Sequence, residues 1–318
     1  MSNRTIAEFR GLVILLAVVV GLTGSCSQAA SSDRSEVDPG GSSSDYEKPV
    51  VVGRIESNEI TESSGLASSL CQPGILWTHN DSGDDAFIFA INSKGERLGT
   101  WLVKDARNDD WEDIASYKDP TGTCYLYIGD IGNNKGDSSH QTIFRVKEPG
   151  VSADAESSSK KSPLDTEPAA PALFKYPEAV HDAETLMVLQ ATGDVYIMTK
   201  RVDGPSAVFK IQPQFGSGAA TVAQRVGEVS LPAVPNGLLT GGAISPDGKR
   251  VIICDYSSAY ELQLGTSTNF DDIWKQKPVP VNLGERKQGE AVTFSADGGS
   301  IFATSEKKNS PVIEVKRK

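Results

Sequence analysis

The chain has 318 residues, of which 38% are hydrophobic and 7% are aromatic, and its formal net charge at pH 7 is −11. A generally acidic surface repels phosphate backbones, so nucleic acid is excluded as an expected partner, and cation binding is favoured. Behind an N-terminal targeting segment, the length fits one large all-β domain or two smaller ones.

The first 26 residues are predicted to be a targeting segment. Arg4 and Arg10 precede an uncharged apolar stretch, residues 11–22, that is too short to span a bilayer comfortably. Small residues then lead to Cys26, and this ending resembles a bacterial lipobox. We therefore expect a lipoprotein-type signal peptide with Cys26 lipidated, and a chain anchored to the bacterial cell envelope by lipid alone. The alternative is an ordinary secretory signal and a secreted soluble protein.

The next segment, residues 27–47, consists mainly of Ser, Asp, Gly and Gln with almost nothing apolar. Such a segment cannot bury enough surface to offset the entropy of ordering, so it is predicted to be a flexible tether. The remaining residues, 48–318, form the predicted folded domain.

Five similar junctions recur in the folded domain. In each, a polar or glycine-rich approach runs into a short apolar strand, followed by a turn and a second apolar run. The junctions are residues 61–67, 108–115, 181–187, 239–244 and 287–293. A repeat of this kind predicts a fold built from similar units.

The units are predicted to be four-stranded antiparallel sheets, because short β-branched runs alternate with turn clusters. The predicted strands are 64–69, 75–79, 87–92 and 97–103; 112–117, 124–129, 142–147 and 173–176; 184–190, 194–200, 207–212 and 223–231; 243–245, 250–255, 260–264 and 279–283; and 290–294, 300–305 and 312–316.

The last unit lacks one strand, which the β-branched run at 49–55 can supply. The sequence therefore predicts an all-β fold, a five-bladed β-propeller closed by its N-terminal strand. The alternative is six blades, with the extra blade hidden between Glu112 and Glu184. Residues 149–170 lack periodicity and are predicted to be a disordered insertion.

Export makes the cysteines informative. Cys71 and Cys124 occupy the same place in successive repeats, the turn before the second strand, so a Cys71–Cys124 disulfide is predicted. Cys254 lies inside an apolar strand and is expected to be a buried free thiol. The alternative is three unpaired thiols.

The first residues of the innermost strands are expected to point toward one axis. These residues are Ser64, Glu112, Glu184, Gly242 and Glu290. Three carboxylates on one axis would repel one another unless a cation neutralised them, and Ca²⁺ takes hard oxygen ligands from several segments. The sequence therefore predicts a Ca²⁺ site. The alternative is a water-filled channel whose glutamates bond to backbone amides.

The layout resembles the calcium-activated nucleotidase (apyrase) propellers. The resemblance rests on Glu62-Ser63-Ser64, Trp111–Ala115, Glu184-Thr185-Leu186 and Gly289–Val292, and it implies an axial calcium held by Ser and Glu side chains. Gly242 departs from this pattern, because it offers only backbone. The segments 77–84 and 127–134 are also similar to exported bacterial propellers of unknown function.

The loops between blades and those after each second strand should share one acidic face. The residues predicted to bind a ligand there are His79, Asn80, Asp84, Asp110, Asn133, Lys200, Arg201, Asp255 and Lys307. The ligand is expected to be a small molecule, a glycan or a protein, bound by a monomeric, envelope-tethered binding protein.

Two hydrolytic functions remain as alternatives. Hydrolysis of phosphoesters or phosphoanhydrides would use axial Ca²⁺, with Asp81 or Asp130 activating water. However, the face carries more carboxylates than cations. Glycoside hydrolysis would use paired carboxylates, for which Asp81, Asp130 and Glu184 could make a set, and the sequence gives no separation for them.

Overall fold

The computed structural model describes residues 45–318, with the exception of residue 137 and residues 232–237. The signal peptide, the lipidated Cys26 and the tether up to residue 44 therefore lie outside the described residues. Within the described part, no helix has the length and apolar character that a membrane crossing requires.

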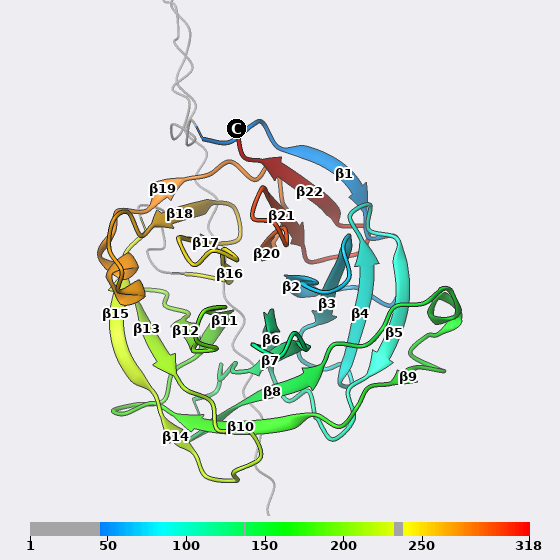
Figure 1. The fold of residues 1–318 in the computed structure, drawn as a ribbon, viewed down its shortest axis with the longest axis horizontal. Coiled ribbons are helices and arrows are strands. Elements are labelled where there is room, and N and C mark those ends of the chain that lie inside the picture. The colour runs from blue at the N-terminus through cyan, green and yellow to red at the C-terminus, as the bar shows by residue number, and fades with distance from the viewer. Residues whose placement is uncertain (1–44, 137, 232–237) are drawn as a thin grey trace, which may run out of the picture. The chain divides into compact units, whose positions relative to one another are not determined.

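The described residues form five mainly antiparallel sheets arranged around a common axis, and each sheet is one blade (Figure 1). Blade 1 contains β2 (Ser63–Ser68), β3 (Ile75–Asn80), β4 (Phe87–Asn92) and β5 (Arg97–Leu102). Blade 2 contains β6 (Trp111–Lys118), β7 (Cys124–Asp130), β8 (Gln141–Lys147) and β10 (Ala170–Lys175).

The other three blades have the same order from the axis outward. Blade 3 contains β11 (Ala183–Val188), β12 (Val195–Thr199), β13 (Ser206–Ile211) and β15 (Gln224–Val229). Blade 4 contains β16 (Gly241–Ile244), β17 (Arg250–Cys254), β18 (Ala259–Gln263) and β19 (Val279–Pro280). Blade 5 contains β20 (Gly289–Phe294), β21 (Ser300–Ser305), β22 (Pro311–Lys316) and β1 (Val50–Arg54).

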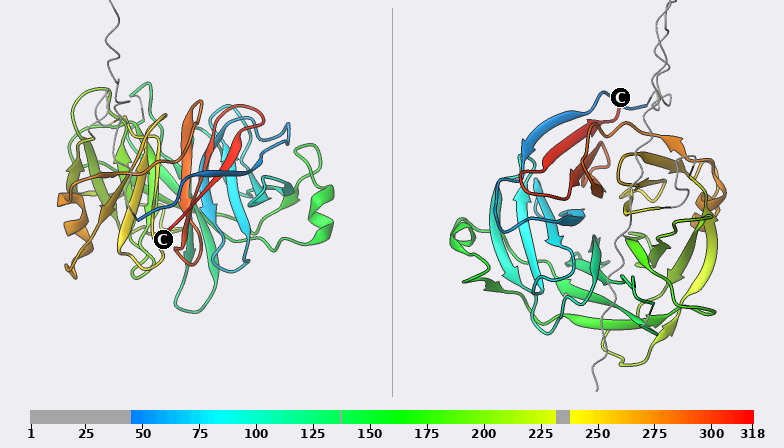
Figure 2. Two further views of the ribbon diagram at one scale, coloured as in Figure 1. Left: turned by 90° about the horizontal axis from the view of Figure 1, so that it is seen from above. Right: turned by 180° about the vertical axis from the view of Figure 1, so that it is seen from behind.

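The ring is closed. The innermost strands contact one another in the order β2, β6, β11, β16, β20 and back to β2, and Figure 2 shows the same ring from behind. Strand β1 pairs antiparallel with β22, so the first described strand completes the last blade. The prediction of a five-bladed propeller closed by its N-terminal strand is confirmed, and the six-blade alternative is wrong.

The hydrophobic core lies between the blades. Trp77 and Ile88 of blade 1 pack with Ile114 and Leu126 of blade 2 in one buried cluster. Four further clusters fill the boundaries between blades 2 and 3, 3 and 4, 4 and 5, and 5 and 1. Each blade therefore buries both faces against its neighbours, which a single exposed sheet could not do.

The segment 149–170 differs from its prediction, because it is ordered against blade 1 instead of disordered. It contains the short 3₁₀ helix η1 (Ala153–Ser157) and β9 (Leu164–Asp165), which pairs in parallel with β5. The Ser158 hydroxyl accepts the Thr100 N–H at 2.8 Å, and Lys160 pairs with Asp84 at 2.5 Å. The composition of this segment predicted disorder, because composition carries no information about pairing. The segment is ordered by pairing with the edge strand of a neighbouring blade.

Two more segments cross blade boundaries. The short β14 (Thr221–Val222), which precedes β15 of blade 3, pairs in parallel with β10 of blade 2. The 3₁₀ helix η2 (Phe270–Lys275) follows β18 of blade 4 and contacts β15 of blade 3. The hydroxyl of Tyr196, in blade 3, donates to Asp271 of η2 at 2.6 Å.

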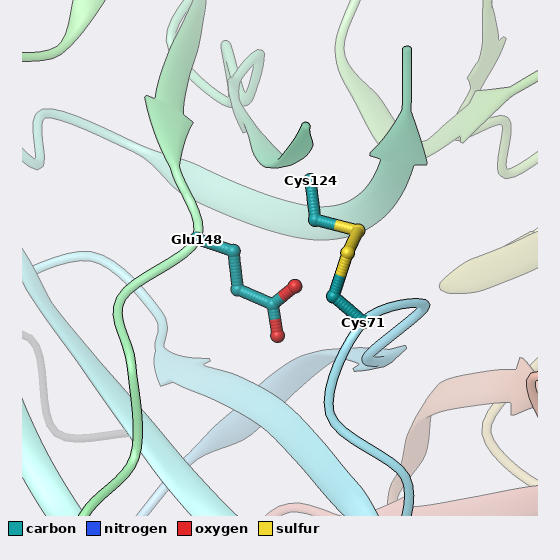
Figure 3. A group of neighbouring side chains, drawn as sticks. All are labelled: Cys71, Cys124 and Glu148. Carbon is teal, nitrogen blue, oxygen red and sulfur yellow. A yellow bond between two sulfur atoms is a disulfide. The ribbon is translucent and has the colours of Figure 1, made fainter. Parts of the chain in front are cut away.

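The predicted disulfide is present. The bond joins Cys71, in the turn before β3 of blade 1, to Cys124, the first residue of β7 of blade 2 (Figure 3). Glu148 lies beside them and accepts hydrogen bonds from the Trp77 indole and the Gln72 amide, both at 2.9 Å. Because both sulfurs are in the disulfide, this group is not a metal site. Cys254 is buried and free, as predicted.

A buried carboxylate, that of Asp113, ties three inner strands together. Its oxygens accept the N–H groups of Ile114 at 2.8 Å and of Leu186, in blade 3, at 2.9 Å. It also accepts the N–H of Gly242, in blade 4. Burial raises the pKa of Asp113, and these backbone donors oppose that shift.

We expect Asp113→Asn to destabilise the protein by about 2–4 kcal/mol, because an amide nitrogen would face a backbone N–H where the carboxylate accepts a hydrogen bond. The measurement is equilibrium unfolding in urea. The control is Asp203→Asn, at a side chain that is 93% exposed, which should change stability by less than about 0.5 kcal/mol. An equally small effect at Asp113 would contradict this role.

We expect loss of the disulfide, by Cys71→Ser, to lower stability by about 4 kcal/mol in the chain-entropy model, because the bond closes a loop with a sequence separation of 53 residues. Unfolding of the unmodified protein with and without reductant should show the same loss. The variant itself should not respond to reductant. Equal midpoints for the unmodified protein under both conditions would contradict the expectation.

Candidate axial cation site

The inner strands are irregular at the predicted site residues. The pairing of β6 with β7 shifts register between Trp111 and Asp113, which leaves Glu112 outside the ladder. Strand β11 shifts in the same way around Glu184. Strands β2 and β20 shift between Ser63 and Leu66 and between Gly289 and Val292. Such β-bulges redirect a side chain away from its normal face.

The bulges of blades 2 and 3 bring carboxylates together. One oxygen each of Glu112, Asp182 and Glu184 lie within 4.8 Å of one another, and so do oxygens of Asp81, Asp110 and Glu112. The two triads share Glu112. We call these five residues, which come from blades 1, 2 and 3, the axial carboxylate cluster.

The cluster carries more negative charge than its surroundings neutralise. Lys200 donates to Glu184, and within the described part of the chain this is the only ion pair that any of the five carboxylates forms. The Lys200 ammonium also lies 5.6 Å from the centre of the Tyr256 ring. Asp182 accepts the Asn133 N–H at 2.7 Å. One lysine therefore faces five carboxylates.

The pKa values reflect this crowding. Burial, followed by repulsion from Glu184, Asp81 and Asp110, raises the pKa of Glu112 well above its usual range. Burial raises the pKa of Glu184 to about 7, although Lys200 opposes the shift. Burial also raises the pKa of Asp81 to about 6. In the absence of a cation, the cluster therefore holds protons that exposed carboxylates would release.

A glycine makes room beside the shared carboxylate. A Cβ atom at Gly132 would lie 2.2 Å from Oε1 of Glu112 and 2.4 Å from Oδ2 of Asp110. The backbone thus approaches both carboxylates more closely than any other residue would allow. A set of carboxylate oxygens with an open backbone cradle fits Ca²⁺, which takes six to eight oxygen ligands at about 2.3–2.6 Å.

The other predicted metal ligands lie outside the two triads. The Ser64 hydroxyl donates to the Glu112 carbonyl at 2.7 Å, so it supports the backbone of the cluster. The Gly242 N–H is bonded to Asp113. Burial, a hydrogen bond to Glu306 and repulsion from Glu306 and Glu184 raise the pKa of Glu290 to about 10. Of the five predicted ligands, the structure groups Glu112 and Glu184.

Several residues predicted to bind a ligand have structural partners instead. His79 is fully buried, and its Nδ1 lies 2.9 Å from the Asn80 carbonyl. Asn80 accepts the N–H groups of Thr61 and Glu62 and donates to the Glu59 carbonyl and to Asp84. These two residues are buried and hold the loops of blade 1 in place, and their contact with a ligand stays a prediction.

Most of the other predicted binding residues form ion pairs or local turns, whereas Asp110 belongs to the cluster and Lys200 pairs with it. Asp84 pairs with Lys160, Arg201 with Asp203 and Lys307 with Glu306. Asp255 is 8% exposed and accepts the N–H groups of Ser257 and Ser258, so it closes a turn. The side chain of Asn133 bonds to the backbone of Ser138 within its own loop.

A pocket of about 690 Å³ opens next to the cluster, on blade 2. Asp110 belongs both to this pocket and to the cluster, and the Asp130 carboxylate accepts the Asp110 N–H at 2.7 Å. Burial raises the pKa of Asp130 to about 6. Both predicted catalytic residues thus neighbour Asp110, Asp81 within the cluster and Asp130 in the pocket.

Sequence reasoning missed Asp182. The available signal was a repeated spacing, because Asp110-Trp111-Glu112 and Asp182-Ala183-Glu184 both place an aspartate two positions before the glutamate of an inner strand. In both blades the two acids reach the same cluster.

No protein-family model matches the chain, and no curated protein matches it either. Among solved structures, the chain is similar to one described as the crystal structure of RRP9 WD40 repeats. The TM-score is 0.45 at 10% sequence identity, and the match covers 86% of this chain and 100% of that chain.

The buried imidazole of His79 gives a pH prediction. Burial lowers its pKa to about 4 from the ordinary 6.5, so the unfolded chain binds the proton more readily. The stabilisation is complete above about pH 6.5 and is lost as the pH falls toward 4. Between pH 7 and pH 5, the free energy of unfolding should fall by about 2 kcal/mol more in the unmodified protein than in His79→Asn.

The measurement is urea unfolding at both pH values. Differences between variants isolate His79 from the carboxylates, whose raised pKa values act in the opposite direction. The control is His140→Asn, at an exposed ring, which should follow the unmodified protein. Parallel pH curves for His79→Asn and the unmodified protein would rule out the buried neutral imidazole.

Proposed function

We propose that this chain is an exported calcium-binding β-propeller that binds a ligand at the acidic end of its axis. The observation that carries the proposal is the pair of carboxylate triads sharing Glu112, with a single lysine among them. Five carboxylates from three blades repel one another at neutral pH, and a divalent cation relieves that repulsion without moving the backbone.

The chemistry of the donors favours Ca²⁺ over other metals. Every member of the two triads is a carboxylate, whereas Zn²⁺ sites are typically built with His or Cys ligands. Mg²⁺ demands near-ideal octahedral geometry, and ligands from separate blades satisfy it less readily than the flexible shell of Ca²⁺. This assignment agrees with the resemblance to the calcium-activated nucleotidase propellers.

Two features support export. The sequence begins with a lipoprotein-type segment ending at Cys26, followed by a polar tether. The disulfide between Cys71 and Cys124 suits an oxidising compartment outside the cytoplasm. We infer that the propeller is held at the bacterial cell envelope by lipid on Cys26.

The pocket beside Asp110 is the proposed ligand site. A bound Ca²⁺ keeps coordination positions that oxygen atoms of a ligand can fill, and the pocket offers polar side chains next to them. Carboxylates dominate this region, so a neutral or cationic ligand such as a glycan or a peptide fits it better than a nucleotide. For this reason binding is proposed ahead of the hydrolytic alternatives.

We expect Ca²⁺ to raise the melting temperature of the unmodified protein relative to the same sample in chelator, and Mg²⁺ at equal concentration to raise it less. Glu112→Gln should melt at a higher temperature than the unmodified protein in chelator, because one repelling buried carboxylate is gone. It should also lose most of the Ca²⁺ response, because both triads lose a shared ligand.

The matched control is Glu178→Gln, at an exposed position outside the cluster, which should keep the full response. A melting temperature of the unmodified protein that is the same with Ca²⁺ and with chelator would reject the calcium site. A full increase in melting temperature with Ca²⁺ in Glu112→Gln would show that Ca²⁺ binds at a site other than the two triads.

A further inference from the structure

Blade 3 carries another pocket, with a volume of about 280 Å³. It lies between the loop that joins β10 to β11 and the loop that joins β12 to β13. Apolar side chains, those of Pro177, Pro205, Ala207 and Phe209, form much of its lining. The pocket therefore combines an apolar surface with the polar residues described next.

The two loops that form this pocket also reach the axial carboxylate cluster. Asp182 belongs to the cluster and Lys200 pairs with Glu184. The Lys200 N–H donates to the Asp182 carbonyl at 2.9 Å, so the two segments lie side by side. One position away in each segment, His181 and Arg201 line the pocket. Because successive side chains of an extended segment point to opposite sides, the cluster and the pocket take alternate residues.

An aromatic group forms the floor of the pocket and fixes the imidazole of His181. The Phe209 ring is buried, and its centre lies 4.7 Å from that of Tyr176 and 5.4 Å from that of His181. The Tyr176 and His181 rings are 4.8 Å apart. Among the described residues the imidazole nitrogens have no hydrogen-bond partner, and both reach solvent. They are therefore available to a ligand.

Two guanidiniums lie at the same pocket. After burial, repulsion from Arg201 and Arg225 is what lowers the pKa of His181, so both charges act on the imidazole. Arg201 pairs with Asp203 at 3.6 Å, and Arg225 pairs with Glu228 at 2.7 Å. All four of these side chains are at least 43% exposed. Exposed ion pairs contribute little, so both guanidiniums can turn to a ligand.

The charge of the lining suits a ligand with one negative charge. Arg201 and Arg225 contribute two positive charges, and Glu178 contributes one negative charge, so the charged residues of the lining sum to +1. A carboxylate balances this charge, whereas a phosphate group, with about 1.5 to 2 negative charges at pH 7, exceeds it. In a chain with a net charge of −11, the pocket is a local reversal of sign.

We propose that this pocket binds a small apolar monocarboxylic acid, with the carboxylate on Arg201 and Arg225 and the apolar part on Phe209. The planar guanidinium matches the two oxygens of a carboxylate. An aromatic ring on the acid would pack against the Phe209 ring, and an N–H of the His181 imidazole can add a hydrogen bond. The volume is just below that of sites for drug-sized ligands, which fits a smaller molecule. The proposal does not depend on the calcium site.

The test is calorimetric binding of phenylacetate to the unmodified protein at pH 7 in chelator. Two related compounds separate the parts of the proposed contact. Acetate lacks the apolar group and phenylacetamide lacks the charge, so each should bind at least about 10-fold more weakly than phenylacetate.

Two variants test the guanidiniums. Arg201→Gln and Arg225→Gln should each bind phenylacetate about 10- to 100-fold more weakly, since a charge-assisted hydrogen bond is lost. Both positions are exposed, so without ligand each variant should melt within about 2 °C of the unmodified protein. Weaker binding at unchanged stability separates a ligand contact from a structural role. The matched control is Arg54→Gln, at an exposed arginine of blade 5, which should bind phenylacetate normally.

Three results would overturn the proposal. The first is the absence of binding by the unmodified protein up to about 10 mM phenylacetate, near the weakest affinity expected for a ligand of this size. The second is binding of acetate or of phenylacetamide as tight as that of phenylacetate. The third is binding by Arg201→Gln and Arg225→Gln that equals binding by Arg54→Gln.

Discussion

Mutual repulsion among carboxylates at the axis is the constraint on which the rest of this structure depends. Glu112 belongs to both triads, and the side chains that meet there come from three blades. Keeping these carboxylates close together requires a rigid backbone in the inner strands. The Asp113 carboxylate supplies it by accepting N–H groups from strands of blades 2, 3 and 4, while Ser64 of blade 1 donates to the Glu112 carbonyl.

That rigidity comes from the way the blades share their cores. Five buried clusters lie between blades, one at each boundary of the ring. Displacing one blade would expose two hydrophobic clusters at once. The ring therefore withstands the electrostatic repulsion among the axial carboxylates. The same arrangement leaves the loops at the axial end free to carry polar side chains instead of core residues.

Much of the fold could be predicted from the sequence, because turn residues and β-branched runs recur at regular intervals. Glu112 and Glu184 could be found because each stands at the polar start of an apolar strand. Asp182 was not placed with them, because it precedes the apolar strand that marks Glu184, and its signal is the spacing that it shares with Asp110 and Glu112. His79 and Asn80 have the composition of a ligand site, and their burial could not be predicted from the sequence.

The short strands β9 and β14 carry a consequence for how such a ring can change. Each extends the outer edge of the blade before its own, so blades 1 and 2 are completed by residues that belong to later repeats. In a propeller made of self-sufficient units, one unit can be duplicated or deleted and the ring re-formed with a different number. In this chain, deleting or duplicating one unit would leave β9 or β14 without the strand it pairs with, and would leave the outer edge of a blade unpaired. The pairing of β9 and β14 with the preceding blades therefore opposes any change in the number of blades from five.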